Sequence, residues 1–102
     1  MGEADRLELQ ERLERICPNV YFQPPSTVRM TYPCIVYNRT GISDRKANNK
    51  TCFMASVYSL TVIDEDPTNT LPVDILQSFS MCNVNSSGVT DNLYHTYLTL
   101  YY

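Results

Sequence analysis

The sequence has very little of the residue types that build most catalytic and nucleotide-binding motifs. Its 102 residues include no tryptophan, three glycines, one histidine and four cysteines. Gly2, Gly41 and Gly88 are too far apart to form a loop that binds a phosphate group. The cysteines form no Cys-x-x-Cys pair, so the spacing of a structural zinc site is missing. We therefore expect no nucleotide, metal or other cofactor, and we expect the cysteines to be free, buried thiols.

Long apolar runs and an excess of positive charge are also missing. No apolar stretch approaches the roughly 20 residues that span a bilayer, and the charged N-terminal segment lacks the apolar core of a secretory signal. Eight basic and eleven acidic residues leave a net charge of -3, which argues against broad binding of nucleic-acid phosphates. We expect no membrane partner, no specific binding to nucleic acid, and assembly in the cytoplasm.

What is present fits one small domain over residues 1–102, because 43% hydrophobic residues in a chain of this length support one modest core. Residues 4–16 are predicted to form an amphipathic helix. Leu9, Leu13 and Ile16 follow helical spacing on one stripe, which Leu7 is expected to widen. Pro18 ends the helix.

Runs of apolar, β-branched and aromatic residues predict strands after the helix. Residues 20–23 form a short extended run before two prolines, which indicates an edge or connecting segment. Residues 34–39 predict a buried strand, and residues 52–64 predict the strand that returns beside it. The polar residues 40–51 between them predict a long hairpin tip.

A short second helix is predicted over residues 73–79. Pro72 suits the first turn of such a helix, and Val73, Leu76 and Phe79 are expected to face inward.

The chain ends in a run that is typical of an inner strand. Residues 81–84 are predicted to begin the last hairpin, residues 85–88 to form its turn, and residues 93–102 to complete it. Bulky side chains occupy both faces of this final strand, which suits one face under a helix and the other against a neighbouring subunit. The predicted fold class is α+β, with a small antiparallel sheet of about four strands flanked by an N-terminal helix and a short second helix.

Two features of the sequence are candidate sites of chemistry. Asp64, Glu65 and Asp66 are the densest carboxylate cluster, but they lack calcium-loop spacing, and the following Pro67 favours the end of a strand. His95 lies among strand residues, where it acts as a general base only if a nucleophile lies opposite; Ser59 and Ser80 are candidates by residue type alone. We expect neither catalytic residues nor a metal site.

Contact between proteins is the better explanation of the remaining composition. Eight tyrosines exceed the need of a small core, and tyrosine combines apolar area with a polar tip. Basic residues gather near the predicted hairpin tip, whereas acidic residues gather in the first helix and near residue 65, a separation that permits head-to-tail pairing of copies. The alternative is a solvated loop without a partner. The residues that we predict at contacts with other copies or other proteins are Arg39, Arg45, Lys46, Asn48, Asn49, Lys50, Tyr58, Asp64, Glu65, Asp66, Tyr97 and Tyr101.

The order of elements and several segments resemble a family of bacteriophage proteins. The segments are residues 20–25 (VYFQPP), 30–37 (MTYPCIVY), 47–50 (ANNK), 58–67 (YSLTVIDEDP), 91–95 (DNLYH) and 98–102 (LTLYY). Together they look like the tail-terminator or tail-completion family of long-tailed phages, also labelled head-tail joining or minor capsid proteins. None of these segments is catalytic, and the run Cys52-Phe53-Met54 has no counterpart in the family.

The resemblance implies a structural role in the virion neck. Such proteins form a ring, usually a hexamer, that caps the tail tube, ends its polymerisation and provides the surface joined to the head. The implied partners are copies of the chain itself, the tail tube protein and a head-completion or connector protein. Residues 40–51 would then face the tube or channel.

Two other functions remain open at this point. One is a neighbouring neck role, such as a head-completion plug or connector adaptor. The other is a small hydrolase or metal-dependent enzyme that uses His95 and Asp64.

Overall fold

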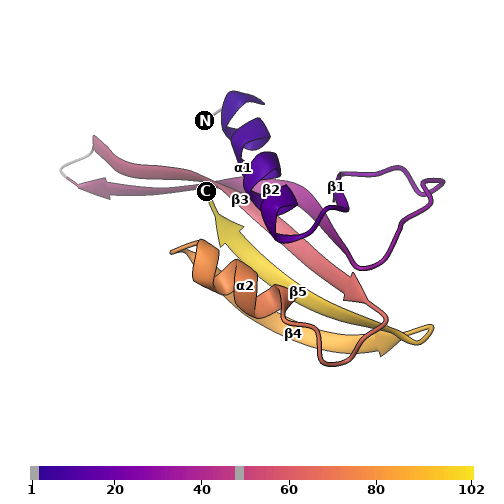
Figure 1. The fold of residues 1–102 in the computed structure, drawn as a ribbon. Coiled ribbons are helices and arrows are strands. Elements are labelled where there is room, and N and C mark those ends of the chain that lie inside the picture. The colour runs from indigo at the N-terminus through magenta and orange to yellow at the C-terminus, as the bar shows by residue number, and fades with distance from the viewer. Residues whose placement is uncertain (1–2, 48–49) are drawn as a thin grey trace.

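Two helices lie on the same face of a five-stranded sheet in the computed structural model (Figure 1). The model describes residues 3–47 and 50–102, and the side chains of residues 6–42 and 56–102. In chain order the elements are α1 (Glu3–Ile16), β1 (Val20–Phe22), β2 (Cys34–Ala47), β3 (Lys50–Asp64), α2 (Leu71–Ser78), β4 (Cys82–Thr90) and β5 (Leu93–Tyr101). The predicted α+β class is confirmed.

The sheet has the strand order β1-β2-β3-β5-β4. β1 runs parallel to β2, and every other neighbouring pair is antiparallel. The sheet is therefore mixed and has five strands, where the sequence predicted an antiparallel sheet of about four. The difference is the short segment at residues 20–22, which forms a true edge strand against Ile35, Val36 and Tyr37.

The last strand is an inner strand, as predicted, because β5 lies between β3 and β4. Leu98 and Leu100 on β5 are fully buried, and they pair in register with Leu60 and Tyr58 on β3. These residues share a face with Ile35 on β2, and this face forms the core beneath the helices.

The first helix buries the predicted stripe. Leu9 and Leu13 are fully buried, and Ile16 packs against the core. Leu7 is 49% exposed, so the expectation that it widens the stripe is wrong. It lies two positions from Leu9, about 200° around the helix, and therefore points away from the sheet.

The second helix presents a different face from the predicted one. Ile75 and Phe79 are buried and Leu71 packs against the core, whereas Val73 is 51% exposed and Leu76 is 37% exposed. Residues 71, 75 and 79 are spaced by four and form one narrow stripe. The inward orientation predicted for Phe79 is confirmed, and that predicted for Val73 and Leu76 is wrong.

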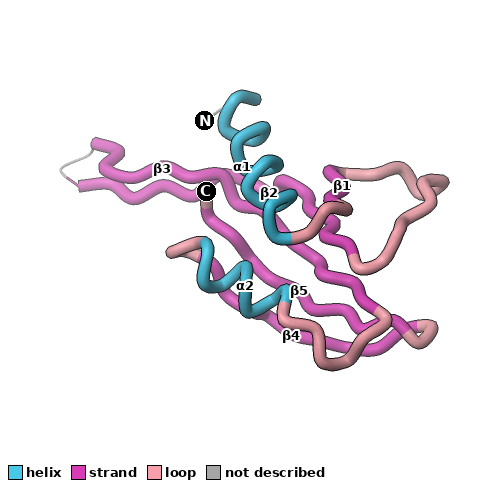
Figure 2. The backbone as a smooth tube through the Cα atoms, viewed as in Figure 1, coloured by secondary structure: helices cyan, strands magenta, loops and turns pink. Residues whose placement is uncertain are grey.

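The predicted hairpin tip is largely strand. β2 continues to Ala47 and β3 begins at Lys50, with a bulge between Arg39 and Gly41 where the Thr40 hydroxyl donates to the Val57 carbonyl at 3.2 Å. Polar residues do not stop a ladder whose backbone groups pair with each other. We call residues 40–47 and 50–55 the arm. It projects beyond the body of the molecule, whose extents are 50 × 24 × 23 Å (Figure 2).

The last hairpin turns later than predicted. Residues 85–88 belong to β4, and the chain reverses at Asp91 and Asn92, whose φ angles are 52° and 62°. Two consecutive positive φ angles match the twist of a two-residue hairpin turn. The polar sequence of residues 85–88 suggested a turn, but these residues form an exposed strand.

Candidate interaction surfaces

The face of the sheet opposite the helices is open to solvent over its middle, although Cys34 and Ile63 at one end of this face are buried. Tyr97 lies in the middle of β5 with strands on both sides, yet it is 39% exposed. A side chain on an inner strand reaches solvent to this extent only where its face lacks a covering layer. Strand alternation and register place these residues on what we call the open face: Val36, Asn38, Val57, Ser59, Thr61, His95, Tyr97, Thr99 and Tyr101.

No acidic, lysine or arginine side chain occurs in this set. Its hydroxyl groups, amide and aromatic rings resemble the composition of protein interfaces, which are enriched in tyrosine and depleted in lysine and glutamate. Tyr97 and Tyr101, both predicted contact residues, lie together on this face. The structure therefore brings two of the predicted residues onto one uncharged surface.

His95 lies on the open face beside Tyr97. The two rings stack with centroids 6.2 Å apart and planes at 20°, and His95 Nδ1 lies 3.1 Å from the Leu93 carbonyl oxygen. These contacts orient the imidazole as part of the surface.

Two of the predicted contact residues lie inside the molecule. Tyr58 is 2% exposed, and its ring centroid is 5.9 Å from that of Tyr37 in the core. Asp64 is 8% exposed, and its Oδ1 accepts a hydrogen bond from the Asp66 backbone at 3.1 Å. In the single chain both residues support packing and a turn.

The acidic cluster organises the loop after β3. Asp66 Oδ1 accepts hydrogen bonds from the Thr68 backbone N–H at 2.9 Å and from the Thr68 hydroxyl at 2.8 Å, and these bonds lower the pKa of Asp66. Glu65 and Asp66 are exposed beside this turn. The carboxylates thus cap a strand end, and the side chains of Glu65 and Asp66 remain available to a partner.

The residues considered for hydrolysis do not converge. Asp64 pairs with Tyr94 in register and lies on the helix-covered face, whereas the neighbouring His95 lies on the open face. Ser59 shares the open face, but its partner on β5 is Thr99, about 13 Å along the strand from His95. Ser80 follows α2, outside the sheet.

The predicted basic contact residues belong to the arm or its base. Arg39 is exposed, and its backbone N–H donates to the Gln23 side chain at 3.3 Å. Arg45, Lys46 and Lys50 occupy described backbone positions, but their side chains lie outside the described residues. Asn48 and Asn49 lie wholly outside them.

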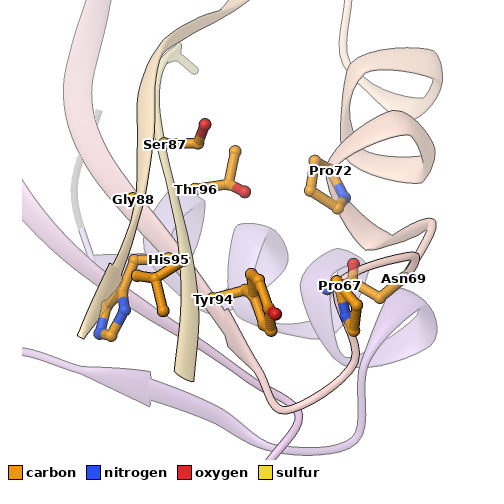
Figure 3. A pocket seen from close by; sticks show the side chains of 9 residues that line it. Pro67, Asn69, Pro72, Ser87, Gly88, Tyr94, His95 and Thr96 are labelled. Carbon is orange, nitrogen blue, oxygen red and sulfur yellow. The ribbon is translucent and has the colours of Figure 1, made fainter. Parts of the chain in front are cut away.

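A small cavity lies between the loop before α2 and the β4–β5 hairpin (Figure 3). Its volume is about 210 Å³, below the usual range of roughly 300–1,000 Å³ for small-molecule sites. The His95 ring points away from it (Figure 3). The lining residues are Pro67, Asn69, Pro72, Ser87, Gly88, Val89, Tyr94, His95 and Thr96.

Three cysteines are free thiols, as predicted: Cys17 and Cys34 are buried, and Cys82 is partly buried. Burial raises the pKa of all three, and that of Cys34 to about 11. Cys52 lies outside the described side chains. In the described part of the chain, no three His, Cys, Asp or Glu side chains are grouped to hold a metal ion.

Sequence reasoning missed the outer edge of β4, because it placed the turn at residues 85–88 instead of at residues 91–92. β4 is the last strand of the sheet, and residues 83–90 are all exposed. The Asp91-Asn92 pair between two strand-like runs is the signal that would have located the turn and hence the edge.

Comparison with known proteins adds no family assignment: no family model matches the chain, and neither does any curated protein. None of the described helices has the length and apolar character needed to cross a membrane.

Proposed function

We propose that this protein is a structural component of the neck of a long-tailed bacteriophage. Copies of it form a ring that caps the tail tube, ends tube polymerisation and joins the tail to the head; the family resemblance implies six subunits in this ring. The proposal combines the resemblance in the sequence with surfaces suited to contact between proteins. The chain performs no catalysis in this role.

The observation that carries the proposal is the uncharged open face. Burying uncharged tyrosine and threonine side chains against a partner avoids the desolvation cost of isolated charges. The helices already cover the other face, so the sheet offers one side to its own core and one side to a neighbour. Tyr97 and Tyr101 are the large side chains on that side.

The distribution of charge supports assembly from identical copies. Residues 39–50 contain four basic residues and one acidic residue, a net charge of +3, while the rest of the chain carries -6 within the total of -3. Attraction between the arm of one copy and the body of the next favours a head-to-tail arrangement, which closes into a ring when the rotation between copies closes. Repeated weak contacts around a ring make the whole cap hold firmly.

Two experiments test this proposal. Size-exclusion chromatography with light scattering of the purified chain is expected to show a discrete oligomer and electron microscopy to show rings. In phage produced without this protein, tails are expected to be longer than normal and detached from heads.

A strictly monomeric chain at high concentration, together with tails of normal length and attachment in its absence, would overturn the proposal. Binding of the purified ring to portal-bearing heads but not to tail tubes would instead assign it to the neighbouring adaptor position in the neck.

A further inference from the structure

The two edges of the sheet are protected to very different degrees. β1 has three residues and is flanked by Pro18 on one side and by Pro24 and Pro25 on the other, which shortens that edge and removes backbone donors. β4 has nine residues, and it contains no proline and no charged residue. Long, uncharged edge strands are the usual sites where another strand adds to a sheet.

The free backbone groups of β4 follow from its pairing with β5. The Met81 carbonyl accepts from the Tyr101 N–H at 2.9 Å, so the next residue, Cys82, directs its N–H and C=O away from β5. By the same alternation, and with the register shift after Val84, Ser87 and Val89 also direct their backbone groups outward. The outer edge thus presents a row of donors and acceptors.

The arm is a two-stranded ribbon, and in the described part of its own copy no further strand pairs with it. β1 pairs with β2 only at residues 35–37, and β5 pairs with β3 from Val57 onward. Within the described part, residues 40–47 of β2 therefore have a strand on one side only. Two-stranded ribbons are marginal in water without a further strand or a packing layer.

We infer that the outer edge of β4 receives the β2 edge of the arm from a second copy of this chain, so that the sheets join head to tail. The free stretch of β2 has eight residues and β4 has nine, which matches their lengths. The arm carries a net charge of +2 and the rest of the chain carries -5, so the second copy is also favoured by charge.

The topology makes this pairing repeatable. β2 and β4 lie toward opposite sides of the strand order, and joining unlike edges leaves one free arm and one free β4 edge at the ends of any chain of copies. Every arm and every β4 edge is paired only when the chain of copies closes into a ring. This inference rests on the proposed ring, and it identifies the surfaces that build it.

Two proline variants each disable one of the two pairing edges, β4 in one variant and the arm in the other. Ser87→Pro deletes an outward N–H of β4 while the bonds to β5 remain. Ile42 pairs with Ser56, whose carbonyl accepts from the Tyr102 N–H, so the Ile42 N–H points away from β3 and Ile42→Pro deletes an outward N–H of the arm. Ser87→Ala and Ile42→Ala are the matched controls, because they keep the N–H groups.

We expect both proline variants to be folded monomers and both alanine variants to assemble like the unmodified chain, as measured by analytical ultracentrifugation, with circular dichroism as the check on folding. Mixed in equal amounts at high concentration, the two proline variants are expected to form a 1:1 dimer, because one retains its arm and the other retains its β4 edge.

Assembly that survives both proline changes in folded protein would overturn this inference and leave the proposed ring in place. Dimers of Ile42→Pro alone would indicate β4-to-β4 pairing and would also overturn it. A monomeric unmodified chain would overturn the proposed function as well.

Discussion

Arg12 shows how one side chain joins the two helices to the end of the chain. Its Nη2 donates to the Ser78 carbonyl at 2.7 Å, and its guanidinium lies 4.3 Å from the centroid of the Phe79 ring and 5.5 Å from that of Tyr102. The Tyr102 hydroxyl in turn donates to Glu8 on α1. A planar cation suits this position because it stacks on rings and donates from its edge at the same time.

Replacing Arg12 by alanine is expected to lower the free energy of unfolding by about 1–2 kcal/mol, because the hydrogen bond to α2 and both ring contacts are lost. Urea denaturation followed by circular dichroism measures the change. Arg15→Ala is the control, since Arg15 is exposed on the same helix, and it is expected to change stability by less than about 0.5 kcal/mol. Equal effects of the two substitutions would contradict the assigned role of Arg12.

The buried Cys34 thiol is expected to make the free energy of unfolding depend on pH in the alkaline range. Burial, and then the nearby Cys17 and Asp64, raise the pKa of its thiol from 9.0 to about 11. The folded chain therefore keeps a proton that the unfolded chain loses above pH 9. The free energy of unfolding is expected to fall between pH 9 and pH 11, by at most about 1.4 kcal/mol per pH unit for this one group.

The measurement is urea denaturation at several pH values between 8 and 11. Cys34→Val is expected to give a shallower decline, because the buried titrating group is removed while the volume is nearly kept. Tyr37, whose pKa burial also raises, leaves a residual decline in the same direction. Identical slopes for the two proteins would rule out the contribution of Cys34.

At the scale of elements, the turn between β4 and β5 sets the register of the final hairpin. Asp91 and Asn92 both adopt positive φ angles, which glycine adopts with the least strain. A two-residue turn leaves Thr90 opposite Leu93 and thereby places Leu98 and Leu100 toward the core. The outer edge of β4 depends on the same turn.

Asn92→Gly is expected to raise the free energy of unfolding by about 0.5–1 kcal/mol, because it relieves the cost of a positive φ angle. Thermal or urea unfolding checks the result. Asn83→Gly, at an exposed position within β4, is the matched control and is expected to destabilise by about 0.5–1 kcal/mol. A change of the same sign in both variants would be inconsistent with the assigned turn.

At the scale of the whole molecule, opposite charges on the arm and the body are expected to make self-association sensitive to salt. Raising sodium chloride from 50 to 500 mM is expected to weaken the oligomer, because salt screens attraction between exposed charges. Sedimentation velocity over a range of protein concentrations measures this dependence. An unchanged dissociation constant across the series would argue against charge-driven pairing.

Charge-reversal variants distinguish the effect of the charge on the arm from the effect of the net charge of the whole chain. The double change Arg45→Glu and Lys46→Glu is expected to weaken association at low salt. The double change Arg15→Glu and Arg29→Glu alters the net charge equally but makes the body more negative, so it is expected to preserve or strengthen association. Loss of assembly in both double variants would point to net charge alone.

Local patterns were sufficient for the elements whose own residues decide their structure. The Leu9–Leu13 stripe and Pro18 predict α1, and the dense β-branched and aromatic residues of 57–63 predict the centre of β3. Side-chain periodicity failed on α2, where the stripe at residues 71, 75 and 79 competes with Val73 and Leu76. The choice between two apolar stripes depends on where the helix meets the sheet, which its own sequence does not contain.

The sequence by itself determined the α+β class, the inner position of the last strand and the charge carried by residues 39–50, because these follow from local periodicity and composition. Only the tertiary structure decided that the polar segments 40–47 and 85–88 are strand, since their backbone groups pair with the returning strand of the same hairpin, a pairing that the polarity of the segments does not reveal. It also decided that Tyr58 is buried while Tyr97 is exposed, because the helices cover only one face of the sheet.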